Sequence, residues 1–258
     1  MGRVERRDEF LASEVREFVL EVGYAECSVL EEETDKILIH AVLDEENADK
    51  YYCTLANGVL KVDAGNANKK ISLTDNNKKT LEKQEVTITV PHNMKFDVLE
   101  LFVGAGTARL SNISSVYGRT EIEVGAGKLT TETLTVEKHI DIEVGAGSAN
   151  ILNLTAATAN IECGVGKMSV KGAVDGDTSI ECGVGHIEMY LDAAESDYNY
   201  DIDCGIGTVL INGSKRGGLF ASNANMVNAG AKGNIKLECG VGKVELITQK
   251  RLAADMTE

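Results

Sequence analysis

The chain has 258 residues, of which 26 are glycine, one is proline, none is tryptophan and 5% are aromatic. Its 41 acidic residues outnumber its 26 basic residues, and the net charge of −15 repels the phosphates of nucleic acids and of anionic membranes. No run of 18 apolar residues exists, so the sequence predicts neither nucleic-acid binding nor direct membrane insertion.

The N-terminal segment, residues 1–16, contains basic residues but lacks the apolar core and small-residue cleavage site of a signal peptide. We expect it to form a short helix rather than an export signal or an anchor. Unpaired cysteines would also suit a reducing compartment, so these two features favour a cytoplasmic location.

Residues 17–100 contain short stretches in which apolar and polar residues alternate, which indicates β-strands. They cover residues 18–23, 36–42, 58–62 and 85–91. Because the end of a stacked β-structure must protect an open sheet edge, we interpret this part as irregular opening coils.

Residues 101–248 repeat a six-residue phrase of the form [IL]-x-[VC]-G-[AVI]-G at intervals of about 20 residues, with one longer interval. We refer to these seven copies as the glycine phrases. Their first glycines are Gly104, Gly125, Gly145, Gly164, Gly183, Gly205 and Gly240, and their second glycines are Gly106, Gly127, Gly147, Gly166, Gly185, Gly207 and Gly242. Glycine at these points indicates tight structural turns in which a side chain would obstruct the backbone.

The interval is too short for a strand–helix–strand unit and contains no helical periodicity. We therefore predict an all-β fold, a single-stranded parallel β-solenoid (β-helix) of about 20 residues per coil, right-handed by the usual crossover rule. One domain would span residues 17–248, with a loop at 213–233 and a polar tail at 249–258.

Equivalent positions of successive coils would form ladders. The inward position before the first glycine becomes cysteine in four phrases: Cys163, Cys182, Cys204 and Cys239. Thiols that are stacked in a line and buried cannot all reach one tetrahedral metal ion. We therefore interpret these cysteines as small apolar residues of the core and predict no metal site there. A pairing of Cys27 with Cys53, in the opening coils, stays open.

The outward position beside it is acidic in six phrases: Glu123, Glu143, Glu162, Glu181, Asp203 and Glu238. Stacked like charges destabilise one another. One interpretation is a solvated face that discourages aggregation. The other is a surface that binds a basic partner or, weakly, Ca²⁺ between adjacent carboxylates. Lys128, Lys167 and Lys243, just past the turns, are alternative counter-charges.

Catalytic chemistry has little support in the sequence. The Gly-x-Gly phrases lack the third glycine and the following helix of a dinucleotide site. The four histidines are scattered, and Arg109 and Arg119 are the only arginines between Leu101 and Ile211. We therefore expect no catalytic residues and no cofactor.

The pattern resembles a bacterial family known as putative adhesins, whose domain is a β-solenoid of unknown function. The resemblance covers roughly residues 18–248. It rests on the strand at 58–62, the Ile-Thr-Val-Pro step at 88–91, the glycine phrases, and the late loop between Ile211–Gly213 and Gly233–Ile235. It implies an envelope-associated or surface role in Gram-positive-type bacteria, and no catalytic residues are implied.

Together these features predict a non-enzymatic structural or interaction module, adhesin-like or envelope-associated, that binds an unknown protein or glycan. The alternatives are a carbohydrate-active enzyme of the β-helix type and a cytoplasmic scaffold or regulatory protein. Oligomers could form by end or edge stacking.

Overall fold

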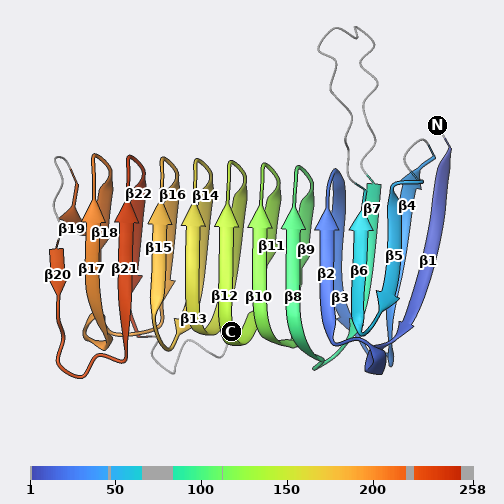
Figure 1. Cartoon of the computed structure of the whole chain (residues 1–258), viewed down its shortest axis with the longest axis horizontal. Coiled ribbons are helices and arrows are strands. Elements are labelled where there is room, and N and C mark those ends of the chain that lie inside the picture. Colours follow the sequence, from blue (N-terminus) through green and yellow to red (C-terminus); the bar gives the residue numbers. More distant parts are fainter. Residues whose placement is uncertain (1, 46–47, 66–83, 112, 219–223, 251–258) are drawn as a thin grey trace, which may run out of the picture.

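The structure is a computed structural model that describes residues 2–45, 48–65, 84–111, 113–218 and 224–250. These residues form 22 strands in one sheet, with two short 3₁₀ turns, η1 (Ala12–Glu14) and η2 (Glu195–Asp197). Figure 1 shows the strands standing side by side along the length of an elongated molecule. Within these ranges no helix has the length and apolarity needed to cross a membrane.

One row of paired strands carries the residues before the glycine turns, and we call it the first row. In spatial order it contains β5 (Tyr51–Ala56), β6 (Val59–Ala64), β2 (Glu17–Val22), β8 (Lys95–Val103), β10 (Val116–Val124), β12 (Leu134–Val144), the end of β13 (Ser148–Cys163), β15 (Thr178–Cys182), β21 (Gly233–Cys239), β17 (Tyr198–Cys204) and β20 (Ala224–Met226).

The second row carries the residues after the turns. In spatial order it contains β1 (Arg3–Leu11), β4 (Lys36–Asp44), β7 (Gln84–Pro91), β3 (Ala25–Glu32), β9 (Thr107–Leu110), β11 (Lys128–Thr131), the start of β13, β14 (Lys167–Val174), β16 (His186–Leu191), β22 (Lys243–Thr248), β18 (Thr208–Ile211) and β19 (Ser214–Gly217).

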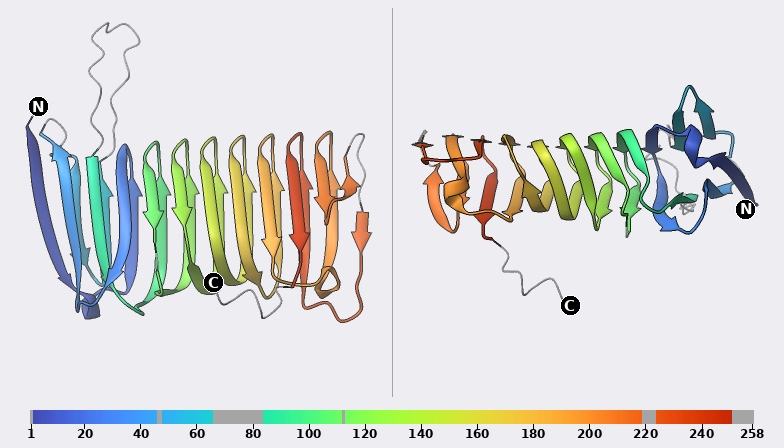
Figure 2. Two further views of the ribbon diagram at one scale, coloured as in Figure 1. Left: turned by 180° about the vertical axis from the view of Figure 1, so that it is seen from behind. Right: turned by 90° about the horizontal axis from the view of Figure 1, so that it is seen from below.

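The two rows belong to one sheet and face each other along the length of the molecule (Figure 2). The core lies between the rows and is built from aliphatic side chains at alternate positions of each strand, as period-two alternation dictates. In the Ile161 phrase, Ile161 and Cys163 point in from the first row and Met168 from the second, each at most 2% exposed.

The prediction of a single-stranded parallel β-solenoid is wrong, because the sheet is mixed. The central strands pair in parallel, but β1, β4 and β7 pair antiparallel, as do β5 with β6, β17 with β20 and β18 with β19. Alternation of apolar residues identifies strands and their inward faces, but it carries no information about the direction in which two strands pair.

The order of the strands also differs from their order in the chain. The last phrase, in β21, lies between β15 and β17 rather than at the end. Likewise, β2 lies between β6 and β8, and β3 lies between β7 and β9. Residues 17–32 are therefore part of the parallel stack and not irregular opening coils.

At the N-terminus the expected short helix is wrong as well. Residues 3–11 form β1, which pairs with β4 over its whole length, and only the 3₁₀ turn η1 follows. A strand is favoured because this edge of the sheet offers backbone partners to each residue.

At the other end, the segment expected to be a loop contains β19 and β20, which add antiparallel edges beside β18 and β17. Its residues 219–223 lie outside the described part of the chain, as do residues 251–258 of the expected polar tail.

Candidate interaction surface

The acidic positions of the glycine phrases lie on the outer side of the first row, in strand register with one another. We call this set the acidic column. Its spatial order is Glu123, Glu143, Glu162, Glu181, Glu238 and Asp203. Neighbouring strands are about 4.8 Å apart, so the column is a line of carboxylates at that spacing. It differs from the chain-order ladder in that Glu238 separates Glu181 from Asp203.

The neighbouring carboxylates of the acidic column repel one another. The pKa of Glu162 is raised above the ordinary carboxyl value by partial burial, and then by the charges of Glu181, Glu143 and Asp141. Among the described residues, Lys236 is the cation that makes an ion pair with the column, through Glu238. The middle of the column, at Glu143 and Glu162, therefore has no ion-pair partner in that part of the chain.

A second, shorter line of carboxylates lies two residues earlier in the same strands. It runs through Glu100, Glu121 and Asp141. Burial raises the pKa of Glu100, and the Glu121 charge adds to the rise. Sequence analysis missed this line because Glu100 and Glu121 precede the repeated phrase and only the register places them side by side.

Shallow hollows follow the two lines. One, of about 270 Å³, lies between the lines and is lined by Glu121, Glu123, Asp141 and Glu143 among others. Another, of about 310 Å³, runs from Glu143 to Glu238 beside the first glycines of the turns. Both are open; the first has a mostly polar lining and the second a mixed one. Such open hollows suit contact with an extended partner rather than enclosure of a small molecule.

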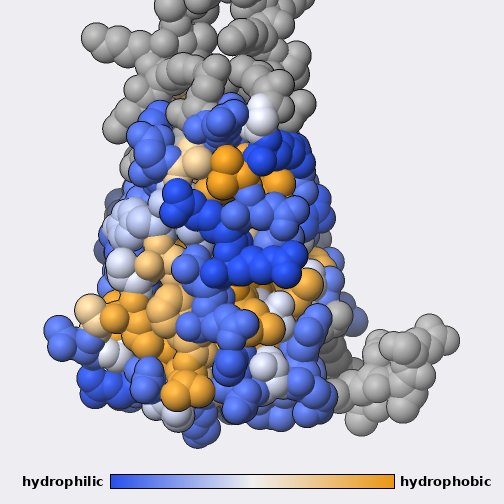
Figure 3. All heavy atoms as spheres, turned by 90° about the vertical axis from the view of Figure 1, so that its right-hand side faces the viewer, coloured by the Kyte–Doolittle hydropathy of each residue, from blue (hydrophilic) through white to orange (hydrophobic). Residues whose placement is uncertain are grey.

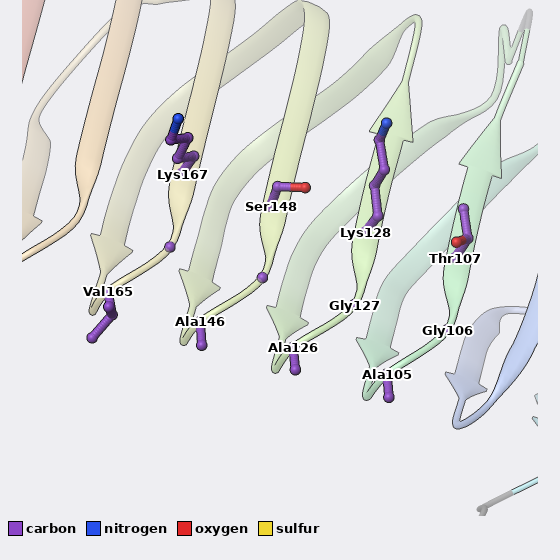
Figure 4. Close-up of a pocket in the computed structure, with 12 residues that line it drawn as sticks. Ala105, Gly106, Thr107, Ala126, Gly127, Lys128, Ala146, Ser148, Val165 and Lys167 are labelled. Atoms are coloured by element: carbon purple, nitrogen blue, oxygen red, sulfur yellow. The ribbon is translucent and has the colours of Figure 1, made fainter.

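The lysines after the turns do not neutralise the acidic column. Beyond each turn the chain crosses to the second row, where Lys128 and Lys167 align with Ser148 between them. Figure 4 shows these side chains along the strands of the second row, around an open hollow of about 560 Å³. Lys243 is 2.6 Å from Glu245, on its own strand, instead of meeting the column.

The turns themselves carry exposed apolar side chains, a feature that sequence analysis missed. The residue between the two glycines points away from the molecule, as Figure 4 shows for Ala105, Ala126, Ala146 and Val165. Four members are large and 57–69% exposed, and we call them the apolar ridge: Val165, Val184, Val241 and Ile206. An aliphatic residue held between two turn glycines was the sequence signal for it.

Backbone hydrogen bonds fix this ridge. The Val165 N–H donates to the Gly145 carbonyl at 2.8 Å, and the Val184 N–H donates to the Gly164 carbonyl at the same distance. Each ridge residue follows three positions after a member of the acidic column. The ridge and the column are consequently parallel lines along one edge of the molecule.

The four phrase cysteines are buried between the rows, and their spatial order is Cys163, Cys182, Cys239 and Cys204. Burial raises the pKa of the Cys182 thiol to about 12 and that of Cys204 to about 11, and the neighbouring Cys239 adds to both. All six cysteines are free, including Cys27 and Cys53. Protonated buried thiols are poor nucleophiles and poor metal ligands.

No family model matches the chain, and no curated protein matches it in sequence. Its fold does match solved bacterial structures. One, described as a putative adhesin from Bacteroides fragilis, is 13% identical, with a TM-score of 0.50 over 94% of this chain and 97% of the other. The two proteins share a fold.

Other solved structures give lower scores. A putative cell adhesion protein from Clostridium sporogenes is 14% identical, with a TM-score of 0.37 over 96% of this chain and all of the other. A putative lipid binding protein from Parabacteroides distasonis is 12% identical, with a TM-score of 0.42 over 96% and 97% of the two chains.

Proposed function

We propose that the protein is a non-enzymatic, adhesin-like interaction module that binds a positively charged partner along its acidic column. The observation that carries this proposal is the unneutralised middle of the column, where Glu162 lies between Glu143 and Glu181. A cationic ligand would relieve the repulsion between these neighbouring carboxylates. That relief would make the binding free energy more favourable.

The partner that suits this surface is a lysine- or arginine-rich segment of a protein, or a glycan that carries amino groups. The apolar ridge lies beside the column, and its exposed valines would contact apolar groups interspersed among the partner's cations. Charged contacts would then set the association rate and the register, and ridge contacts would slow dissociation.

The direct test is titration with decalysine at increasing salt. We expect binding that weakens steeply with ionic strength, because exposed charges are screened. The triple variant E143Q/E162Q/E181Q should bind at least tenfold more weakly. Its matched control is E5Q/E9Q/E14Q, which changes the net charge equally at β1 and η1, far along the molecule, and should bind like the wild type. Equal losses in both triple variants would show that only net charge matters, and would contradict the proposal.

A second candidate is weak Ca²⁺ binding by the same carboxylates, favoured by the 4.8 Å spacing that lets one ion contact two neighbours. Millimolar Ca²⁺ should raise the melting temperature of the wild type and leave that of E143Q/E162Q/E181Q unchanged. If Ca²⁺ does not move the wild-type melting temperature, the column does not hold it.

The enzyme alternative makes an opposite prediction. A binding module retains a glycan polymer intact, whereas a carbohydrate-active enzyme creates new chain ends. Incubation with a panel of polysaccharides, followed by a reducing-end assay, should show retention without new ends. If the wild type produces new chain ends and a variant of the polar outer face does not, the protein is an enzyme and the binding proposal is wrong.

A further inference from the structure

A cluster of metal-ligating side chains lies on the second row, away from the acidic column. His186 and Glu188 point outward from β16, and Glu245 points outward from the neighbouring β22, where it pairs in register with Glu188. One ligating atom of each residue lies within 4.8 Å of those of the other two. The cluster exists only because β22 lies next to β16, an adjacency that chain order does not predict.

The distances suit a small divalent ion. His186 Nε2 is 3.2 Å from Glu188 Oε1 and 3.8 Å from Glu245 Oε2. Ligands bound to tetrahedral zinc at about 2.0–2.2 Å are about 3.3–3.6 Å apart. The two distances from the nitrogen are therefore already close to those of a zinc ligand set. Rotation of the partly exposed glutamate side chains would bring their oxygens, which are within 4.8 Å of each other, to the same ion.

The imidazole nitrogen is a second, independent indication. His186 Nε2 is shielded from solvent and finds no hydrogen-bond partner within the part of the chain that the structure describes, although it faces two carboxylates. Buried polar atoms are ordinarily satisfied, so an orphaned nitrogen aimed at carboxylates needs an explanation. A metal ion between the three groups supplies one.

Two lysines and several uncharged side chains surround the three candidate ligands. Lys243 Nζ is 2.6 Å from Glu245 Oε2 and already places a positive charge there. Lys167 and Ser169 of β14 lie beside His186 and Glu188, and Thr208 and Leu210 of β18 lie beside Lys243 and Glu245. Lys243 is therefore the direct competitor of an incoming cation.

We propose that His186, Glu188 and Glu245 form a Zn²⁺ site with one position left open to water. One imidazole and two carboxylates satisfy the ligand preference of zinc, and three protein ligands leave the fourth position free. This site does not depend on the acidic column or its partner. The buried cysteines do not compete, since burial keeps their thiols protonated.

The test is calorimetric titration of the metal-stripped full chain with Zn²⁺. We expect one tight equivalent per chain, weakened at least tenfold in H186Q and in E245Q. The matched control is H139Q, because His139 Nε2 contacts a single carboxylate, Asp141 at 3.0 Å. H139Q and E143Q/E162Q/E181Q should keep the tight equivalent, and K243M should strengthen it by removing the competing ammonium.

Two readouts make the outcome decisive. Metal-free H186Q should melt at the wild-type temperature, which shows that its lost affinity is not lost folding. Co²⁺ in place of Zn²⁺ should give no thiolate-to-metal charge-transfer absorption. The proposal is overturned if Zn²⁺ does not bind, if H186Q binds as tightly as the wild type, or if the Co²⁺ spectrum reports thiolate ligation.

Discussion

The two glycines of one turn differ in how closely another backbone approaches them. A Cβ atom built on Gly166 would lie 2.4 Å from the Gly147 carbonyl oxygen, whereas one built on Gly164 would lie 3.1 Å from the Gly145 oxygen. The second glycine is required by this approach of the neighbouring turn, and the first tolerates a small adjustment.

We therefore predict that G166A is the more damaging of two matched variants. It should lower the free energy of unfolding by about 1–3 kcal/mol, the usual cost of forcing an extra methyl group into a packed site. G164A should cost clearly less. Denaturant unfolding of both proteins measures the difference, and equal losses would contradict the role assigned to the carbonyl contact.

The buried thiols predict sensitivity to alkali. Burial raises the pKa of Cys182 to about 12, so its contribution to stability is complete below the ordinary thiol pKa near 8.5 and is lost as the pH rises toward 12. Valine occupies the equivalent position at Val144. C182V should therefore fold normally and lose a few degrees less in melting temperature between pH 8 and 10.5 than the wild type.

The control for that experiment is I180V, a core substitution on the same strand that leaves the thiols in place. It should lower the melting temperature at every pH but keep the wild-type slope. If C182V keeps the wild-type slope too, thiol ionisation is not the source of alkaline unfolding.

At the scale of the strand ladder, substitution of two glutamates of the acidic column distinguishes the effect of like-charge repulsion from that of ion pairing. E162Q removes a charge that has like-charged neighbours on both sides, so it should raise the melting temperature at low salt. E238Q removes the partner of Lys236 and should not. The gain in E162Q should shrink at high salt.

A change of pH tests the same repulsion, with E162Q as the reference protein. Because the pKa of Glu162 is raised, its contribution is greatest below the ordinary carboxyl pKa and is lost as the pH rises through the folded-state value. Lowering the pH from 7 to 5 should thus stabilise the wild type relative to E162Q. An identical pH response in both proteins would show that the column stores no repulsion.

The strands also show what a single sequence could predict here. Alternation located the strands of the glycine phrases and the residues that point inward, such as Ile161 and Cys163, because burial imposes a period of two. It could not place β21 between β15 and β17, since all the phrases offer similar partners. For that reason the His186 and Glu245 pairing, and with it the candidate zinc site, was invisible before the structure.

The antiparallel ends were unpredictable for a different reason. Residues 3–11 and 36–44 contain no copy of the repeated phrase, so nothing in their spacing shows that they pair with each other. Their direction follows from the path of the connecting chain, which local patterns do not encode.

At the scale of the whole molecule, the N-terminal end shows how stacking is opposed. That end mixes apolar side chains, gathered toward its lower part, with strongly hydrophilic ones (Figure 3). Its edge strand β1 exposes Arg3, Glu5, Arg7 and Glu9 at alternate positions. Charged residues on an edge strand discourage pairing with a second molecule.

We accordingly predict a monomer whose mass by light scattering does not change with concentration. The variant E5V/R7V/E9V removes the charges of the edge and should associate as concentration rises, while the matched E5Q/R7Q/E9Q, which stays polar, should remain monomeric. A wild-type mass that grows with concentration would show that the ends stack despite these charges.

The insertion of β21 and β22 between earlier strands has a consequence for synthesis. A ribosome releases the chain from its N-terminus, so β17 and β18 leave the exit tunnel before the two strands that separate them from β15 and β16. The nascent chain must hold residues 198–211 undocked until residues 233–248 arrive. Residues 198–211 can therefore join the stack only together with residues 233–248, and a chain truncated before residue 233 would have a stack that stops at β15 and β16.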